Sequence, residues 1–173
     1  LKLDKVRFIP AGDPWRKNHR RVTLAAVRLE MVRAAIAPFD WAEVSTVEVD
    51  RGGPSYTADT LAALVQPDED WWFILGADAL ADMPAWHEPR RIVELARLAV
   101  TRRPEVDGEL IPPDLREAIP HIEERVDMVD MSPLDISATD IRRRVRDGRS
   151  TEFLVPASVR EVIDRHGLYL DAD

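Results

Sequence analysis

The sequence of 173 residues contains no cysteine, which excludes disulfide bonds and metal sites built on thiolates. It has only four histidines, and none of them has a partner at the short spacing of a zinc motif: His19, His87, His121 and His166. We therefore expect no zinc site, and no metal ion held directly by protein side chains.

Long apolar runs are missing as well. The sequence has no stretch of about 18 apolar residues, the length that could span a membrane. It also has no charged leader followed by an apolar run, which is the pattern of a secretion signal. The expected location is the cytoplasm. The net charge of −8 argues against a general binder of nucleic acid or anionic membrane, because such proteins rely on a positive field. Basic residues gather locally at 16–21, 102–103 and 142–149, which favours a small phosphate ligand over a polymer, although any one of these clusters could be an ordinary solvated face.

The chain does contain an alternation of strand-like and helical segments. Apolar and β-branched runs predict strands at 6–10, 44–49, 71–75, 97–101 and 126–131. Apolar residues three and four apart, with capping residues, predict helices at 23–36, 55–65, 90–95 and 157–165, and a further helix after Ser137, with Gly167 ending the last one. The run 71–75 has no polar alternation, as expected for a parallel strand buried on both faces. This order predicts one α/β domain, 1–173, with a mainly parallel sheet, flanking helices and a small C-terminal helical part.

Ligands of parallel sheets bind at the carboxyl ends of the strands. In this chain nearly every segment that follows a predicted strand has chemistry suited to phosphates or sugars: 12–17, 52–57, 76–78, 102–103 and 137–142. Gly76 would let a ligand approach the backbone, and Asp78 could accept a hydrogen bond from a sugar hydroxyl. A glycine and an aspartate alone more often make a simple turn, so it is the convergence of five segments that favours a nucleotide site.

The segment 136–142 carries the clearest of these signals. Ser137 is suited to cap a helix, and the free N–H groups and dipole of such a helix end favour an anion, most commonly phosphate. Arg142 follows about one turn later, where its guanidinium could form two parallel bonds to that phosphate. Taken alone, a serine before a helix is more often only a cap, and 142–146 only a solvated basic face.

Together these segments resemble the bacterial nicotinate mononucleotide adenylyltransferases of the nucleotidyltransferase superfamily. Residues 136–142, Ile-Ser-Ala-Thr-Asp-Ile-Arg, are similar to the superfamily motif I-S-[SA]-T-x-I-R. Residues 54–61, 73–80 and 84–86 are similar to the family's P-S-Y-T-x-x-T-L, G-x-D-x-L and tryptophan segments, and the ending 167–169, Gly-Leu-Tyr, fits its tail. The resemblance spans nearly the whole chain and implies a Rossmann-like nucleotidyltransferase fold.

The resemblance also implies a reaction in NAD biosynthesis: transfer of AMP from ATP to nicotinate mononucleotide, which gives nicotinate adenine dinucleotide and pyrophosphate. ATP and nicotinate mononucleotide would be the binding partners, with Mg²⁺ bound through the ATP phosphates, and a homo-oligomer is left open. The nucleophile is a phosphate monoester with a second pKa of about 6, so it is mostly ionised at pH 7 and needs no general base. Catalysis would then rest on positioning and charge neutralisation.

By the same resemblance, the residues divide between the two substrates. Lys17 and Arg142 would be catalytic through contacts to phosphate. The ATP side would be held by Gly76, Asp78, Ile136, Ser137, Thr139 and Arg142. The pyridine nucleotide would be held by Tyr56, Thr57, Asp78, Trp86, His87 and Arg103, of which Arg103 is the weakest candidate.

Two of these roles have a physical rationale on the pyridine side. Trp86 would stack on the pyridine ring, and backbone N–H groups around Thr57 and His87 would take the nicotinate carboxylate, because a helix N-terminus prefers an anion to a neutral amide. Relatives often carry tyrosine where His87 stands, so the role of its side chain is left open.

One family motif has no match. The segment G-G-[TS]-F-D-P-[IV]-H-x-G-H, whose histidines stabilise the transferring phosphate, is expected upstream of Leu1 together with the first strand and helix. We expect a chain truly truncated at Leu1 to be inactive and poorly folded. Two alternatives stay open: phosphopantetheine adenylyltransferase, which shares the superfamily motif, and a non-catalytic nucleotide-binding or sensor domain.

Overall fold

The computed structural model describes residues 1–14, 22–101, 110–132 and 134–170. The chain forms two compact units, which are described separately: unit 1 is Tyr56–Leu134 with Leu1, and unit 2 is Lys2–Ser55 with Asp135–Asp173. Every strand pair among the described residues is parallel, so the predicted α/β class is confirmed. The single domain 1–173 stays a prediction. No helix within the described ranges combines the length and apolar character needed to cross a membrane.

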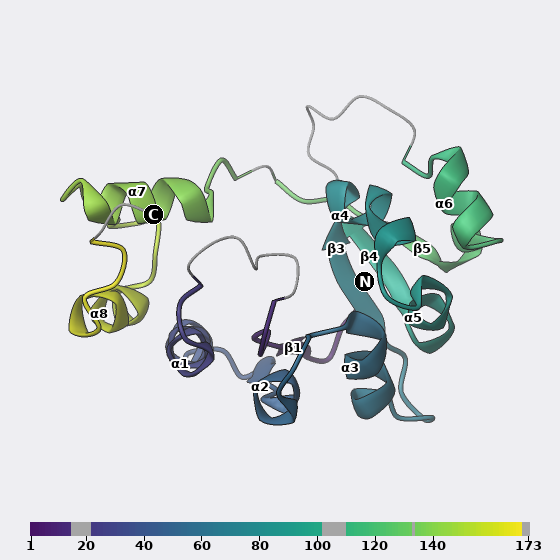
Figure 1. Ribbon diagram of the computed structural model, residues 1–173, viewed down its shortest axis with the longest axis horizontal. Coiled ribbons are helices and arrows are strands. Elements are labelled where there is room, and N and C mark those ends of the chain that lie inside the picture. Colours follow the sequence, from purple (N-terminus) through teal and green to yellow (C-terminus); the bar gives the residue numbers. More distant parts are fainter. Residues whose placement is uncertain (15–21, 102–109, 133, 171–173) are drawn as a thin grey trace. The chain divides into compact units, whose positions relative to one another are not determined.

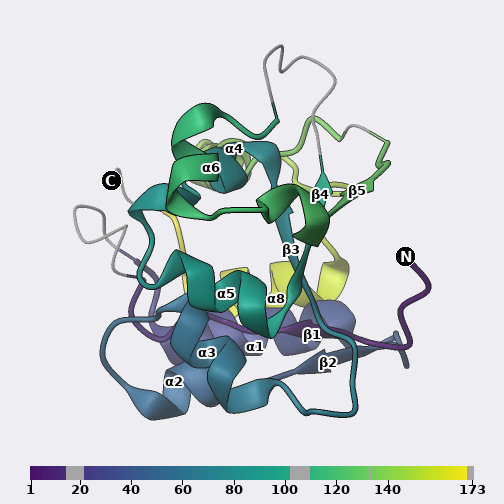
Figure 2. The ribbon, with the colours of Figure 1, turned by 90° about the vertical axis from the view of Figure 1, so that its right-hand side faces the viewer.

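Unit 1 is built on a parallel sheet with the strand order β3-β4-β5 (Figure 1). The strands are β3 (Trp72–Gly76), β4 (Arg97–Thr101) and β5 (Val126–Val129). Helix α3 (Thr57–Leu64) precedes the sheet. The connections contain α4 (Ala77–Ala81), the 3-10 helix η2 (Met83–Ala85), α5 (Pro89–Leu95), α6 (Pro113–Ala118) and the 3-10 helix η3 (Ile122–Arg125). Helices α3 and α5 lie side by side in both ribbon views (Figure 2).

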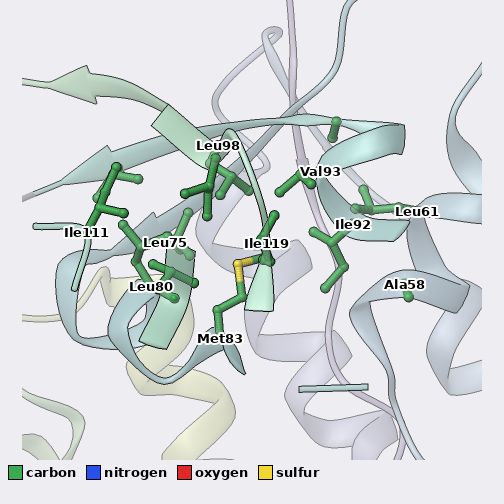
Figure 3. Close-up of a cluster of buried hydrophobic side chains, with 14 residues drawn as sticks. Ala58, Leu61, Leu75, Leu80, Met83, Ile92, Val93, Leu98, Ile111 and Ile119 are labelled. Atoms are coloured by element: carbon green, nitrogen blue, oxygen red, sulfur yellow. The ribbon is translucent and has the colours of Figure 1, made fainter. Parts of the chain in front are cut away.

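The core of unit 1 lies between one face of this sheet and its helices (Figure 3). Leu98 of β4 is fully buried, as are Leu80, Met83 and Ile92 from the helices. Because side chains alternate along a strand, Leu75 points into this core, whereas Ile74 on the other face is 48% exposed. The prediction that 71–75 is buried on both faces is therefore wrong.

Unit 2 contains a second parallel pair, β1 (Val6–Phe8) and β2 (Ala42–Val44), joined through α1 (Ala25–Ile36). Its other helices are α2 (Val47–Arg51), α7 (Ala138–Arg146) and α8 (Ala157–Arg165). Helix α8 packs on α1 through buried Val27, Val159, Val162 and Ile163. At the edges of this contact the Ser158 hydroxyl donates to the Ala34 carbonyl at 2.8 Å, and Arg165 donates to the Glu30 carboxylate at 2.6 Å.

The end of α8 confirms the prediction made for Gly167. This glycine has φ = 57°, and the next N–H, that of Leu168, donates back to the carbonyl of Ile163 at 3.0 Å. The Gly167 N–H donates to the carbonyl of Asp164 at 3.1 Å. These two bonds form a Schellman motif, in which glycine adopts the left-handed conformation at little cost.

The strand predicted at 44–49 is only partly right. Strand β2 ends at Val44, and Val47 already begins α2. Val47 and Val49 at alternate positions indicate a strand, but the polar residues on either side of them favour a helical turn. The Thr46 hydroxyl donates to the Asp50 carboxylate at 2.5 Å, four residues on, as such a turn allows. Glu48 in the middle of this turn is buried.

Candidate active site

The N-terminus of α3 lies in the segment predicted to bind the pyridine nucleotide. Tyr56 occupies the N-cap position with extended backbone (φ −97°, ψ 131°), and its carbonyl accepts from the Thr60 N–H at 3.1 Å. Thr57 is the first residue of the helix, and the Tyr56 side chain forms no capping bond. The first N–H groups of a helix have no partner within it and form the positive end of the dipole. This helix end is therefore suited to a carboxylate.

Two segments far apart in the sequence meet beside this helix end. The rings of Tyr56 and His87 stack with centroids 4.3 Å apart and planes tilted by 30°. His87 lies between η2 and α5, and its side chain is 45% exposed. The contact joins the Pro-Ser-Tyr-Thr segment to the Pro-Ala-Trp-His segment, and both carry residues that were predicted to hold the pyridine nucleotide.

A charged cluster flanks the stack. One ligand atom each from Asp59, His87 and Glu88 lies within 4.8 Å of the others. The positive charge of Arg91 balances the two carboxylates of this cluster. Its guanidinium donates to the Glu88 carboxylate at 2.8 Å and lies 4.0 Å from the Asp59 carboxylate. The bond to Glu88 raises the pKa of Arg91. A metal ion would compete with this guanidinium, so we assign none. Sequence reasoning missed the cluster; the three-residue spacing from Glu88, the N-cap residue of α5, to Arg91 in its first turn could have revealed half of it.

Trp86 packs against the sheet through an aromatic contact. Its ring meets Phe73 edge to face, with centroids 6.0 Å apart and planes at 80°. The side chain is half-buried, and its indole N–H is buried without a hydrogen-bond partner among the described residues. Trp86 therefore packs against the core of unit 1 with part of its surface left exposed.

The turn after β3 leaves open space. Gly76 is exposed, its φ of −80° suits any residue, and a Cβ added there would meet no atom within 4 Å. Asp78, two residues on in α4, is exposed as well. The backbone at Gly76 can thus be approached closely, and the Asp78 carboxylate can accept hydrogen bonds from outside the fold.

In unit 2, α7 begins as predicted at the superfamily motif. Ser137 is the N-cap (φ −118°, ψ 145°), and its hydroxyl accepts from the Asp140 N–H at 3.1 Å. Thr139 is exposed in the first turn, and Ile136 before it is 45% exposed. The end of this nine-residue helix therefore presents its N–H groups at an exposed surface.

Three of the four arginines of α7, Arg142, Arg143 and Arg144, differ in what they contact. Arg143 and Arg144 both donate to the Asp140 carboxylate, Arg144 at 2.6 Å, and these bonds lower the pKa of Asp140. Arg142 makes no hydrogen bond or ion pair with any other described residue, and it is half-exposed. Of the three guanidiniums, that of Arg142 is the one left available to an anion.

The predicted site residues thus fall into two groups. Unit 1 holds Tyr56, Thr57, Gly76, Asp78, Trp86 and His87, whereas unit 2 holds Ile136, Ser137, Thr139 and Arg142. Within unit 1 the structure brings Tyr56 and His87 into contact. The remaining two predicted residues, Lys17 and Arg103, lie outside the described residues.

Comparisons with known proteins agree with these motifs. Residues 1–144 match a family model described as cytidylyltransferase-like. A probable nicotinate-nucleotide adenylyltransferase of Roseiflexus is 45% identical over 170 residues, which cover 98% of this chain and 84% of the relative. Another of that name, from Thermomicrobium roseum, is 42% identical over 171 residues, which cover 98% and 79%.

A solved structure supports the same fold. Plasmodium falciparum nicotinic acid mononucleotide adenylyltransferase, complexed with NaAD, superposes with a TM-score of 0.69 at 15% identity, covering 96% of this chain and 82% of that one. At this identity the likeness concerns the fold, and it confirms the predicted Rossmann-like nucleotidyltransferase architecture. With sequence identities above 40% over nearly its whole length, the chain belongs to the cytidylyltransferase-like family and, within it, to the nicotinate-nucleotide adenylyltransferases.

Proposed function

We propose that this protein transfers AMP from ATP to nicotinate mononucleotide, forming nicotinate adenine dinucleotide and pyrophosphate in NAD biosynthesis. The observation that carries the proposal is the ring stack of Tyr56 on His87, which joins the two pyridine-binding segments beside the N-terminus of α3. The relatives' shared name, at 42–45% identity, supports the same substrate.

On the pyridine side, the residues of unit 1 bind and orient the substrate. Trp86, whose ring contacts Phe73 edge to face, stacks on the pyridine ring. The N–H groups at Thr57 and His87 take the nicotinate carboxylate, and the positive end of the α3 dipole makes the acid a better ligand than the amide. Asp78 accepts hydrogen bonds from ribose hydroxyls. Arg103 is a further candidate for a substrate contact.

On the ATP side, the anion site is the start of α7 in unit 2. Ser137 caps the helix, and Thr139 and Arg142 contact the phosphates, with Ile136 beside the nucleotide. In unit 1, Gly76 is a separate candidate for a nucleotide contact. Lys17 reaches a phosphate as a point charge. None of these residues has to act as a base, because the attacking phosphate monoester is already mostly ionised at pH 7.

We also propose that Mg²⁺ enters on the ATP phosphates. The carboxylate nearest the start of α7 in sequence, Asp140, is engaged by Arg143 and Arg144, so phosphate oxygens are the ligands that fit this hard cation there. When bound, the ion neutralises charge on the leaving pyrophosphate.

The test is calorimetric titration of the folded protein with nicotinate mononucleotide and with its nicotinamide analogue. We expect saturable binding that favours the acid. Trp86→Ala should weaken binding by about tenfold to a hundredfold, because stacking on an aromatic side chain contributes about 1–3 kcal/mol and each 1.4 kcal/mol is a factor of ten. Calorimetry is preferable to tryptophan quenching, since the substitution removes the fluorophore itself.

Two variants serve as controls. Trp86→Phe keeps a ring against Phe73 and should retain most of the affinity, and Trp41→Ala removes a 49% exposed tryptophan of unit 2 and should change nothing. Equal binding by wild-type and Trp86→Ala proteins would remove Trp86 from the site. If the folded protein bound ATP but neither pyridine nucleotide, the sensor alternative would replace the proposed reaction.

A further inference from the structure

We propose that Arg91 sets how strongly the pyridine site of unit 1 prefers an acid to an amide, because it neutralises the carboxylates of Asp59 and Glu88. Arg91 acts on the charge around the substrate without touching it, so this role rests on the proposed binding of nicotinate mononucleotide. The residues concerned all belong to unit 1.

The start of α3 already carries a negative charge of its own. Asp59 lies in the first turn of this helix, at the end that is proposed to take the nicotinate carboxylate. An acidic side chain is favourable there by itself, since the helix end carries about half a positive charge. A second anion at the same end is repelled by the first. Unless its charge is balanced, Asp59 therefore weakens the binding of an acid and leaves that of a neutral amide unaffected.

Glu88 brings a second negative charge to this place from another segment. Its carboxylate lies 3.7 Å from the Nε2 of His87. The His87 ring stacks on that of Tyr56, which is the N-cap residue of α3. One ligand atom each from Asp59, His87 and Glu88 lies within 4.8 Å of the others. Two carboxylates thus meet beside the proposed site for a third.

Arg91 supplies the opposite charge to both carboxylates. Its Nη1 donates to the Glu88 carboxylate at 2.8 Å, and the same nitrogen lies 4.0 Å from the Asp59 carboxylate. Glu88 first, and then Asp59 and Glu94, raise the pKa of Arg91. A guanidinium stays protonated in proteins in any case, so this counter-charge is present at every pH at which the site is used.

Core packing sets how the two helices that carry this pair lie. Ala58, beside Asp59, and Ile92, beside Arg91, are fully buried and belong to the core of unit 1 (Figure 3). Helices α3 and α5 also lie side by side in both ribbon views (Figure 2). The side chains of Arg91 and Asp59 are 45% and 40% exposed, and exposed ion pairs contribute little to stability. Removing the charge of Arg91 should therefore change the electrostatics of the site far more than its fold.

The first experiment compares the calorimetric Kd for nicotinate mononucleotide with that for its nicotinamide analogue at low salt. Both ligands carry the same phosphate, so the ratio of the two values isolates the carboxylate. We expect Arg91→Met to weaken binding of the acid about fivefold and to change binding of the amide less than about twofold, as suits a partly exposed charge. The loss should shrink in about 1 M salt, which screens such charges.

Two further variants separate charge from shape. Arg91→Lys keeps the charge and should retain most of the preference for the acid. Arg90→Met removes the same charge from the neighbouring position, where the side chain donates to the Ala118 carbonyl instead, and it should leave the ratio as in wild type. If a folded Arg91→Met protein lost affinity equally for acid and amide, or for neither, the inference would be overturned.

The second experiment restores the balance by removing the negative charges as well. Glu88→Gln and Asp59→Asn, added to Arg91→Met, should return the preference for the acid to about the wild-type value, and a triple variant that stays at the Arg91→Met ratio would contradict the proposal. Should Arg91→Met not fold, Asp59→Asn alone decides: it should strengthen binding of the acid about twofold to fivefold and leave the amide unchanged. A wild-type protein that binds neither pyridine nucleotide would reject the proposed function, and the role of Arg91 with it. Acid-selective binding that no change at Arg91 or Asp59 alters would reject this role alone.

Discussion

Two glycines lie at or beyond the carboxyl ends of parallel strands in this protein, and their surroundings are opposite. Gly12, after β1, would place a Cβ 2.2 Å from the Glu48 oxygen, and both its N–H and its carbonyl are hydrogen-bonded by the side chains of Ser55 and Arg28. Gly76, the last residue of β3, is exposed, and a Cβ there would meet nothing within 4 Å. The same residue type thus serves close packing of the chain in unit 2 and an open approach to the backbone in unit 1.

The difference reflects where each unit is held together. In unit 2 the turn itself is fixed, whereas in unit 1 the sheet is joined at its other end, where the strands begin. There the Asp127 carboxylate of β5 accepts from the Trp72 indole at 2.7 Å and from two nitrogens of Arg97 at 2.7 and 2.8 Å. One carboxylate therefore links all three strands at the end of the sheet away from Gly76.

Gly12→Ala should produce the largest effect, because the atoms in its way are backbone. We expect it to destabilise unit 2 by about 1–3 kcal/mol, the usual range for overpacking. Chemical unfolding gives the magnitude, and hydrogen exchange read by mass spectrometry gives the location, which should be α1 and α2 with α3–α5 unchanged. A Gly12→Ala protein as stable as wild type would mean that this turn is not closely packed.

Gly76→Ala should show the reverse pattern. Its φ of −80° and the empty space around it predict a change in stability within about 0.5 kcal/mol. If the nucleotide approaches this backbone as proposed, the calorimetric Kd for ATP should rise about tenfold, equivalent to about 1.4 kcal/mol. An alanine variant with unchanged ATP affinity would make Gly76 an ordinary turn glycine.

Most elements could be predicted from periodicity, including α1 to within two residues and the left-handed Gly167. The errors arise where side-chain contacts and burial override the apolar pattern. Val47 and Val49 fit a strand by alternation, but the Thr46–Asp50 contact and the burial of Glu48 favour α2. The apolar run 71–75 has no polar alternation, so the prediction was that both faces of this strand are buried. The sequence does not reveal that the helices of unit 1 cover only the face that carries Leu75.

For the candidate site, the sequence identified the segments that contribute residues, but it did not reveal which side chains contact one another. Ser137 as a cap follows from local preference and is confirmed. The stack of Tyr56 on His87 and the engagement of Asp140 by Arg143 and Arg144, which leaves Arg142 apart, required coordinates. The contact of Arg91 with Asp59 carried no motif signal at all, since the two residues lie on different helices.

Asp127→Asn should have the smallest effect, and it tests the held end of unit 1. Bonds from Arg97, and then from Trp72, lower the pKa of Asp127 from 3.8 to about 2. A carboxyl with a depressed pKa in the folded state stabilises the protein above its unfolded pKa, and this contribution is lost as the pH falls from about 4 towards 2. Because the side chain is 30% exposed, solvent screens it, and we expect a loss of only about 1 kcal/mol at pH 7.

Urea unfolding at several pH values checks this prediction. The difference between wild type and Asp127→Asn should be constant from pH 7 to about pH 5 and should shrink towards zero near pH 2. Trp72→Phe, which keeps the ring but removes one donor to Asp127, should lose less stability than Asp127→Asn. The Kd for ATP should stay unchanged in both variants, because the bonds lie where the strands begin. A weaker ATP affinity would show that the open turn at Gly76 depends on this distant carboxylate, and the contrast with Gly12 would no longer hold.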